Sequence, residues 1–241
     1  MLIIYLEVIY TQETNVKFKS TKDVASSRVA ILLTGQSGVG KTSQCRYLPE
    51  DRTLIISAEA GLLCLQGTNY AVKEIKSTED LLEVYSYLAG SKADFDYIFI
   101  DSLTEILEIV LAELKEDPKY ADPKMTLKMY GTYNEMSTKI IKSFRDLTQY
   151  SVIFTCLDDL AKNGVELIEE FNIPGSAIKA DLKAWFDICI HMKNFKDDKG
   201  ESIRKFITDN SESRLAKDRS GKLDSYEEAN IGELINKILG E

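Results

Sequence analysis

The chain has 241 residues, of which 44% are hydrophobic and 29% are charged. This length and composition suit one globular α/β domain with a substantial core, and they exclude intrinsic disorder and fibrous repeats. The net charge of −9 excludes a generally basic surface. Any contact with nucleic acid therefore needs a local basic patch or a groove shared by several copies of the chain.

The N-terminal run of residues 1–10 is apolar but contains Glu7 and is much shorter than a membrane span, so we expect a strand rather than a membrane anchor. The four cysteines form no CxxC pair and lie mostly in apolar stretches. This pattern favours buried thiols in a reducing compartment, and hence a cytoplasmic protein. His191, the single histidine, lies in a strand-like run, where we expect a packed or partly exposed side chain rather than a metal ligand or catalytic group.

Strand-like runs alternate with stretches of helical periodicity over most of the chain. The strand-like runs are residues 29–34, 53–58, 97–100 and 151–156. Helices are expected from Ser77 to Gly90, from about Ser102 to Leu114, and around an apolar stripe between residues 133 and 147. The alternation predicts a mostly parallel, twisted sheet flanked by helices.

The pattern changes to short strands after Asp187. Residues 198–200 read Asp-Lys-Gly and predict a hairpin turn between strands at 188–192 and 204–208. We therefore expect a C-terminal antiparallel extension of the sheet, followed by a short amphipathic helix at residues 231–239.

No internal repeat or low-complexity linker divides the chain. We expect residues 28–241 to form one domain and residues 1–27 to be an appendage of unassigned role.

Residues 35–42 read GQSGVGKT and match the P-loop pattern GxxxxGK[ST] between an expected strand and a helix. In such a loop, hereafter the P-loop, glycines let backbone N–H groups converge on phosphate oxygens at a helix N-terminus. Lys41 is expected to reach the β and γ phosphates of ATP, and Thr42 to bind Mg²⁺. The residues predicted to bind the nucleotide are Gly35, Gln36, Ser37, Gly38, Val39, Gly40, Lys41, Thr42 and Ser43.

Two acids follow strand-like runs. Asp101 ends an apolar run, as expected for a Walker B acid that holds Mg²⁺ together with Thr42, although an ordinary strand end would look the same. Glu59 follows the run at 53–58, and strand ends gather around the nucleotide in this fold class. The alternative for Glu59 is a solvated surface glutamate.

Two segments carry a family resemblance. Ile-Ser-Ala-Glu-Ala at 56–60 and Ile-Asp-Ser-Leu-Thr at 100–104 are similar to the catalytic-glutamate and Walker B segments of RecA-like recombinases. Within that superfamily the chain resembles small phage-type RecA-core ATPases of single-strand annealing and recombination, through the sequences at 59–62, 130–131 and 217–219. The resemblance spans about residues 29–223 and implies a RecA-like P-loop NTPase core.

The resemblance also implies roles for single residues. Glu59 would be the base that polarises water. Lys217 and Arg219 would cross a subunit boundary to the neighbour's γ-phosphate, so that copies assemble head to tail into a ring or filament. The alternative for both is an exposed basic turn. The predicted catalytic residues are thus Glu59, Lys41, Lys217 and Arg219.

Single-stranded DNA is the partner that the resemblance implies, held by loops along the axis of the assembly. Residues 115–124 offer a modest set of cations with one aromatic ring, namely Lys115, Lys119, Tyr120 and Lys124. Residues 158–179 are rich in acids, which repel phosphate. Thr155 and Cys156 stand at the γ-phosphate sensor position, where recombinases of the RecA type carry an amide.

The expected function is Mg²⁺-dependent binding and hydrolysis of ATP, which regulates action on single-stranded DNA in recombination, annealing or repair. One alternative is a helicase loader or another motor of DNA metabolism on the same core. A second is a nucleotide-gated scaffold that binds ATP without turnover. An ATPase assay with and without single-stranded DNA would narrow these alternatives most, and translocation or unwinding rather than annealing would indicate the motor.

Overall fold

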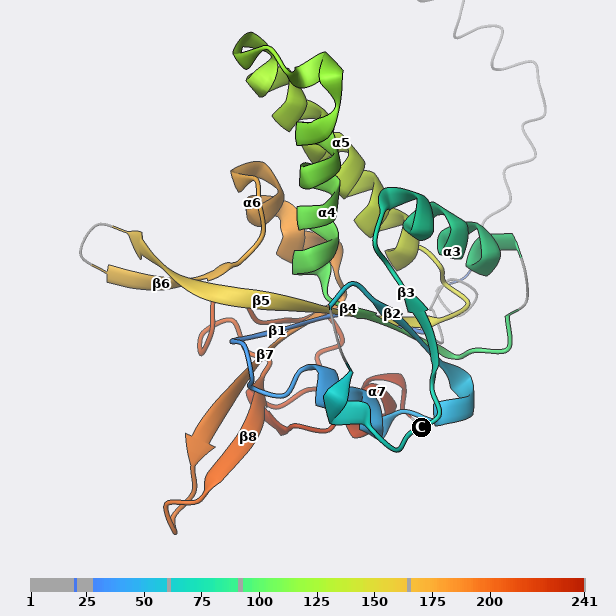
Figure 1. The fold of residues 1–241 in the computed structure, drawn as a ribbon. Coiled ribbons are helices and arrows are strands. Elements are labelled where there is room, and N and C mark those ends of the chain that lie inside the picture. Colours follow the sequence, from blue (N-terminus) through green and yellow to red (C-terminus); the bar gives the residue numbers. More distant parts are fainter. Residues whose placement is uncertain (1–19, 21–27, 60–61, 91–92, 164–165, 241) are drawn as a thin grey trace, which may run out of the picture.

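The computed structural model describes residues 20, 28–59, 62–90, 93–163 and 166–240. Ten strands among them form one sheet of order β10-β8-β7-β1-β5-β4-β2-β3, with β6 paired to β5 and β9 to β7 (Figure 1). The strands are β1 (Ala30–Gly35), β2 (Thr53–Ser57), β3 (Ala71–Glu74), β4 (Tyr97–Asp101), β5 (Ser151–Asn163), β6 (Glu166–Phe171), β7 (Ile188–Lys196), β8 (Ser202–Ile207), β9 (Lys217–Asp218) and β10 (Tyr226–Glu228). The strand predicted at residues 1–10 lies outside the described residues, and the division at residue 27 stays a prediction.

The centre of the sheet is parallel. β1 pairs in parallel with β5 and β7, and β4 pairs in parallel with β5 and β2. The carboxyl ends of these strands therefore meet at one edge of the sheet. Beyond β7, the strands β8 and β10 continue the sheet in antiparallel pairing. This confirms the predicted α/β fold with a mostly parallel sheet and a C-terminal antiparallel extension.

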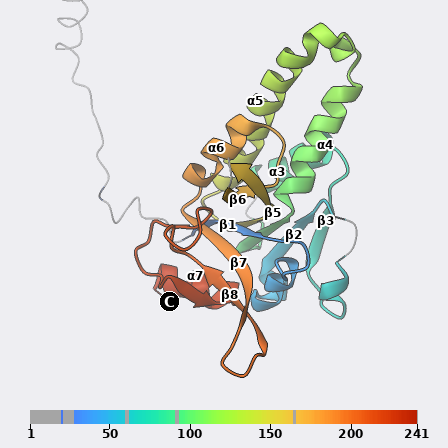
Figure 2. The same cartoon turned by 90° about the vertical axis from the view of Figure 1, so that its left-hand side faces the viewer.

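Helices cover both faces of the sheet. The α-helices are α3 (Thr78–Gly90), α4 (Leu103–Glu116), α5 (Thr126–Arg145), α6 (Ser176–Trp185) and α7 (Ile231–Leu239). The short 3₁₀ helices are η1 (Thr42–Tyr47), η2 (Glu50–Arg52), η3 (Leu63–Leu65), η4 (Pro118–Tyr120) and η5 (Pro123–Met125). Helices α3 to α6 lie on one face and α7 with η1 on the other, while α4 and α5 form an antiparallel pair that projects away from the sheet (Figures 1 and 2).

The two faces explain the continuous apolar runs of the central strands. Leu32 of β1 packs in the core under α4, whereas Ile31 and Leu33 pack in the core next to α7, and all three are fully buried. Alternate residues of a strand point to opposite faces, so a strand covered on both sides needs apolar residues at every position.

Three features differ from the sequence-based expectation. The helix expected after the P-loop is only the 3₁₀ helix η1, which ends because Leu48 precedes Pro49 and has extended backbone. Strand β5 runs seven residues beyond its predicted end at 156 and pairs with β6, so most of the described residues between 158 and 179 belong to β5, β6 and the start of α6 rather than to a loop. β3 was not predicted, because its four residues are largely exposed and lack an apolar pattern.

Three of the four cysteines are buried, as the sequence predicts. Cys45, Cys156 and Cys189 are buried and free, whereas Cys64 is exposed. Burial raises the pKa of each buried thiol to about 12. Among the described residues, no helix has the length and apolar character needed to cross a membrane. The cellular compartment stays a prediction.

Helix α7 closes the core on the η1 face, and Ile235 at its centre is fully buried. Ile235→Ala is expected to lower the free energy of unfolding by about 2–5 kcal/mol, because the substitution leaves a cavity. Asn236→Ala changes the exposed neighbour and is expected to stay within about 0.5 kcal/mol of the parent chain. Urea unfolding measures both, and equal stabilities for the two variants would contradict a core role for α7.

Candidate functional site

The P-loop begins at the end of β1 and turns at three glycines. A Cβ atom on Gly35 would lie 2.8 Å from Val39 Cγ1 and 2.9 Å from Met192 O, which leaves no space for a side chain. Gly38 and Gly40 have φ angles of 76° and 108°, which other residues adopt only with strain. The glycines therefore permit a tight turn of the backbone at the edge of the sheet.

Lys41 points back into the P-loop and is 7% exposed. Its Nζ donates hydrogen bonds to the backbone oxygens of Gly35 at 2.7 Å and Gln36 at 3.0 Å. Burial lowers the pKa of Lys41, and neighbouring negative groups, with Asp158 first among them, oppose that effect. The ammonium group is thus held at the start of the loop by acceptors that phosphate oxygens can replace.

Asp101, the last residue of β4, is buried and has two hydroxyl partners. Thr42 Oγ1 donates to Oδ2 at 2.8 Å, and Thr155 Oγ1 donates to Oδ1 at 2.5 Å. Burial raises the pKa of Asp101, and the two hydroxyl groups counteract the rise. The structure therefore brings together the two residues predicted to hold Mg²⁺, and it adds Thr155 as a support that the sequence pattern does not reveal.

Glu59 lies two residues beyond the end of β2 and is exposed. Ser57 Oγ donates to the backbone oxygen of Glu59 at 3.2 Å. The charge of Glu59 acts on both Lys41 and Asp101, which places it at the same edge of the sheet. The side chain is thus close enough to the loop to influence it electrostatically and remains accessible to water.

Three residues beside the P-loop are not among the predicted site residues. His191 is 1% exposed, as expected for a packed side chain, but its Nε2 lies 2.8 Å from Asp158 Oδ2. The guanidinium group of Arg204 lies 3.2 Å from the position that a Cβ on Gly40 would take. Asp158 lies just beyond the residues of β5 that pair in parallel with β1, a place comparable to that of Asp101 at the end of β4, so the strand-end rule would have found it if the pairing of β5 had been known.

The sequence itself identifies the class of this site. Residues 27–220 match the sequence model of the family described as AAA domain. The chain belongs to this AAA domain family. AAA domains are in general nucleotide-binding ATPases, so the chain falls in that broad class, while the recombinase part of the resemblance stays a prediction. No curated protein matches the sequence.

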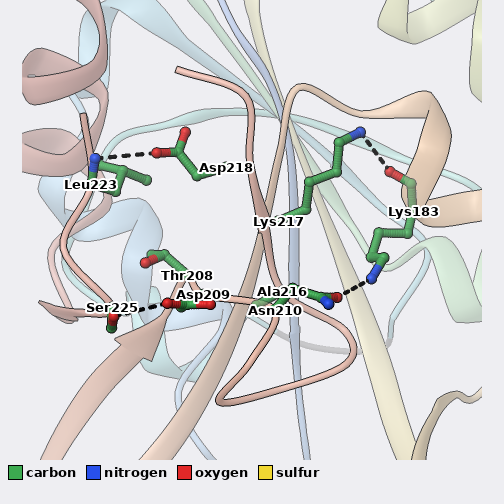
Figure 3. Close-up of a pocket in the computed structure, with 9 residues that line it drawn as sticks. All are labelled: Lys183, Thr208, Asp209, Asn210, Ala216, Lys217, Asp218, Leu223 and Ser225. Atoms are coloured by element: carbon green, nitrogen blue, oxygen red, sulfur yellow. Dashed lines mark hydrogen bonds between the residues drawn. The ribbon is translucent and has the colours of Figure 1, made fainter. Parts of the chain in front are cut away.

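Lys217 and Arg219 lie near the beginning of the parallel strands, at the end of the sheet opposite to the P-loop. They belong to β9 and the residue after it, and β9 pairs with the first residues of β7, whereas the P-loop follows the last residue of β1. Lys217 Nζ donates to the backbone oxygen of Lys183 at 3.0 Å, in α6 (Figure 3). It also donates to the backbone oxygen of Phe186, just after α6, at 2.5 Å. Arg219 Nη2 donates to Ala184 O at 3.1 Å. Within one chain, neither cation reaches the P-loop.

One residue of the segment at 115–124, which was proposed to contact single-stranded DNA, is not available for that role. Tyr120 is buried, and its hydroxyl lies 2.8 Å from Thr132 Oγ1. Lys119 is paired with Asp117 at 2.7 Å. The ring of Tyr120 is therefore unavailable for stacking on bases, because it fills the core between α4 and α5, and only exposed cations remain in the predicted set.

Lys217 satisfies backbone oxygens at the end of α6, and its pKa is lowered by burial. Lys217→Ala is expected to lower the free energy of unfolding by about 1–3 kcal/mol, since these partly buried acceptors lose their donor. Lys199→Ala, in the exposed turn between β7 and β8, is the matched control and is expected to have little effect. Urea unfolding of both variants is the measurement. A Lys217 variant as stable as the control would show that this contact does not stabilise the fold.

Proposed function

We propose that this AAA domain binds Mg-ATP at the P-loop and hydrolyses it. The observation that carries the proposal is the 2.8 Å hydrogen bond between Thr42 and Asp101, next to the buried ammonium group of Lys41. A hydroxyl and a carboxylate are oxygen donors that suit Mg²⁺, which keeps several of its waters. When bound, Mg²⁺ would neutralise charge on the β and γ phosphates.

The chain's own residues perform the remaining tasks. Lys41 exchanges its two backbone acceptors for phosphate oxygens. Thr155 keeps the carboxylate of Asp101 oriented toward Thr42 by its 2.5 Å hydrogen bond. Because Thr42, Asp101 and Thr155 are already in contact, little rearrangement of these three side chains is needed for the reaction, and this favours catalysis.

Glu59 is our candidate for the general base, as the resemblance to RecA-like recombinases implies. The side chain of Glu59 is exposed and therefore has access to water, and its negative charge favours the charged form of Lys41. A carboxylate in that position can take the proton of a water molecule that attacks the γ-phosphate.

Action on single-stranded DNA and head-to-tail assembly are the finer parts of the proposal. Both rest on the resemblance of the segments around Glu59, Asp101 and Lys217. The net charge of −9 means that DNA contact, where it occurs, would use exposed cations gathered along a shared groove. Stimulation of ATP turnover by single-stranded DNA would support this part, and translocation along DNA would favour a motor instead.

Lys41→Ala is expected to weaken Mg-ATP binding about tenfold or more, because hydrogen bonds between an ammonium group and phosphate oxygens are lost. Titration calorimetry with Mg-ATP measures the affinity. Lys76→Ala removes an exposed lysine that follows β3, the last strand in the sheet order, and should leave the affinity unchanged. Equal affinities for the Lys41 variant and the parent chain would contradict nucleotide binding at this loop.

Glu59→Gln is expected to lower kcat by about two orders of magnitude or more with Mg-ATP still bound, because an amide does not accept the proton. Arg219→Ala is expected to lower kcat if Arg219 reaches the phosphate of the next copy. Mixing the two variants should then restore part of the activity. Some interfaces in the mixture would pair an intact Glu59 on one chain with an intact Arg219 on the next, and the active site at those interfaces would be complete. Steady-state ATPase assays, with light scattering to follow assembly, are the measurement. A mixture that co-assembles but stays as inactive as its parents would rule out action across the subunit boundary.

A further inference from the structure

A surface cavity adjoins the P-loop on the face of the sheet that carries η1 and α7. It has a volume of about 570 Å³ and is bounded by η1, by the paired strands β7 and β8, and by the start of α7. Sites for small molecules have volumes of about 300–1,000 Å³. Gln44 and Tyr47 of η1 line the cavity, and η1 begins at Thr42, directly after Lys41. The cavity is therefore continuous with the segment that would hold the phosphates.

The start of α7 is held firmly against η1. Gln44 Oε1 accepts a hydrogen bond from Ile231 N at 3.1 Å. Gly232 leaves no space for a side chain, because a Cβ atom there would lie 2.3 Å from Tyr47 O. The wall that α7 forms is thus part of the folded chain, and a ligand would not have to create the cavity.

Arg204 of β8 joins this cavity to the P-loop. Its backbone lies opposite Asn194 of β7, and its guanidinium atoms Cζ and Nη1 lie 3.2 Å from the position that a Cβ on Gly40 would take. Within the described part of the chain, no hydrogen bond or ion pair engages this guanidinium group. An arginine lacks a partner here although it lies against the loop. Its planar cation is therefore free to stack on a flat ring or to bind an anion.

Tyr47 provides an aromatic ring in the same cavity and is 51% exposed. Exposed aromatic rings and arginine planes are the surfaces on which nucleobases stack. Asn194 and Glu233 also line the cavity, and their side chains make no hydrogen bond to any other described residue. An amide and a carboxylate suit the edge of adenine that presents a ring nitrogen and an amine. The cavity thus combines stacking surfaces with polar groups that have no other partner.

The order of strands gives the direction in which a nucleotide would lie. β1 lies between β7 on one side and β5 and β4 on the other, so Asp101 and the cavity are on opposite sides of the P-loop. Mg²⁺ bridges the β and γ phosphates, and Thr42 and Asp101 are the residues that would hold it. The γ-phosphate would therefore lie toward β4. The nucleoside would extend the other way, toward β7 and β8, where Arg204 and the cavity are.

We propose that this cavity binds the nucleoside half of ATP, and that Arg204 and Tyr47 contribute to affinity by stacking on the adenine ring. The inference rests on the proposed binding of Mg-ATP at the P-loop. Arg204 acts within its own chain, in contrast to Arg219, which is proposed to act on the next copy. A purely electrostatic contact of Arg204 with a phosphate predicts different measurements, because it does not depend on the base.

The test compares Mg-ATP with Mg-tripolyphosphate, which has three linked phosphates and no nucleoside. Arg204→Ala and Tyr47→Ala are each expected to lower the affinity for Mg-ATP about tenfold, because stacking is lost. Both variants are expected to keep their affinity for Mg-tripolyphosphate within about threefold of the parent chain. Lys41→Ala is expected to weaken both ligands, since the lysine contacts phosphates. Titration calorimetry measures the affinities, and thermal unfolding shows that each variant is folded.

Arg204→Lys separates stacking from charge. Lysine keeps the positive charge but lacks the planar guanidinium group, so this variant is expected to lose most of the Mg-ATP affinity that Arg204→Ala loses. Lys196→Ala removes an exposed cation of β7, and Tyr87→Ala removes an exposed tyrosine of α3. Both control variants are expected to bind the two ligands like the parent chain.

Two results would overturn the inference while the parent chain still binds Mg-ATP. If Arg204→Ala and Tyr47→Ala bind Mg-ATP like the parent, the nucleoside lies elsewhere. If Arg204→Ala weakens both ligands equally and Arg204→Lys restores them, the arginine binds a phosphate and does not stack on the base. If the parent chain binds neither ligand, the proposed function itself fails, and the inference fails with it. Binding of the parent chain therefore distinguishes the two kinds of failure.

Discussion

The parallel pairing of β1, β5 and β4 is the constraint on which the site depends. Gly35 lies opposite Leu157, and Ile100 lies opposite Phe154, so strands from distant parts of the chain end at one edge of the sheet. Two hydrogen bonds then join three segments through Thr42, Asp101 and Thr155. Because side chains alternate along a strand, a shift of one residue between β4 and β5 would turn Asp101 to the other face and separate it from Thr155. The apolar residues that fill both faces fix this register, and in that sense the core determines the geometry of the site.

Burial gives the site its chemical character. It disfavours the charged forms of both Lys41 and Asp101, lowering the pKa of the one and raising that of the other. Each charge is kept only because specific partners surround it, backbone oxygens for the lysine and hydroxyl groups for the aspartate. Phosphate oxygens and Mg²⁺ are stronger partners than these. The nucleotide and its metal ion would therefore stabilise the charged forms of Lys41 and Asp101 further.

Patterns within short stretches of the sequence predict much of the fold and of the site. The features that these patterns miss depend on contacts between segments that are distant in the sequence. The glycine and lysine spacing of the P-loop, the apolar strand before Asp101 and the alternation of strands and helices are all visible within short windows. The support of Asp101 by Thr155 depends on which strand lies next to β4, and no window contains that information. The same holds for the contact between Asp158 and His191, for the burial of Tyr120 between two helices, and for the carbonyl partners of Lys217. The length of β5 was underestimated for a related reason, since its extension is held by the antiparallel partner β6 rather than by an apolar pattern of its own.

The balance of charge at the loop gives a physical argument about assembly. The carboxylates of Asp158, Asp101 and Glu59 all act on Lys41. A nucleotide triphosphate adds further negative charge to the same place. Among the described residues around the loop, the cations are Lys41, Arg204 and Lys193, and Lys193 is paired with Glu169. Lys41 and Arg204 together do not offset three carboxylates and a triphosphate. Mg²⁺ reduces the imbalance, and a cation supplied by another copy would reduce it further as charge moves during phosphoryl transfer. Arg219 is better suited to that task than Lys217, because its side chain is 55% exposed although it contacts Ala184 O and Asp187, whereas Lys217 donates to several carbonyl groups at the end of α6. In the proposed head-to-tail assembly, the arginine rather than the lysine is therefore the candidate to approach the neighbouring phosphate.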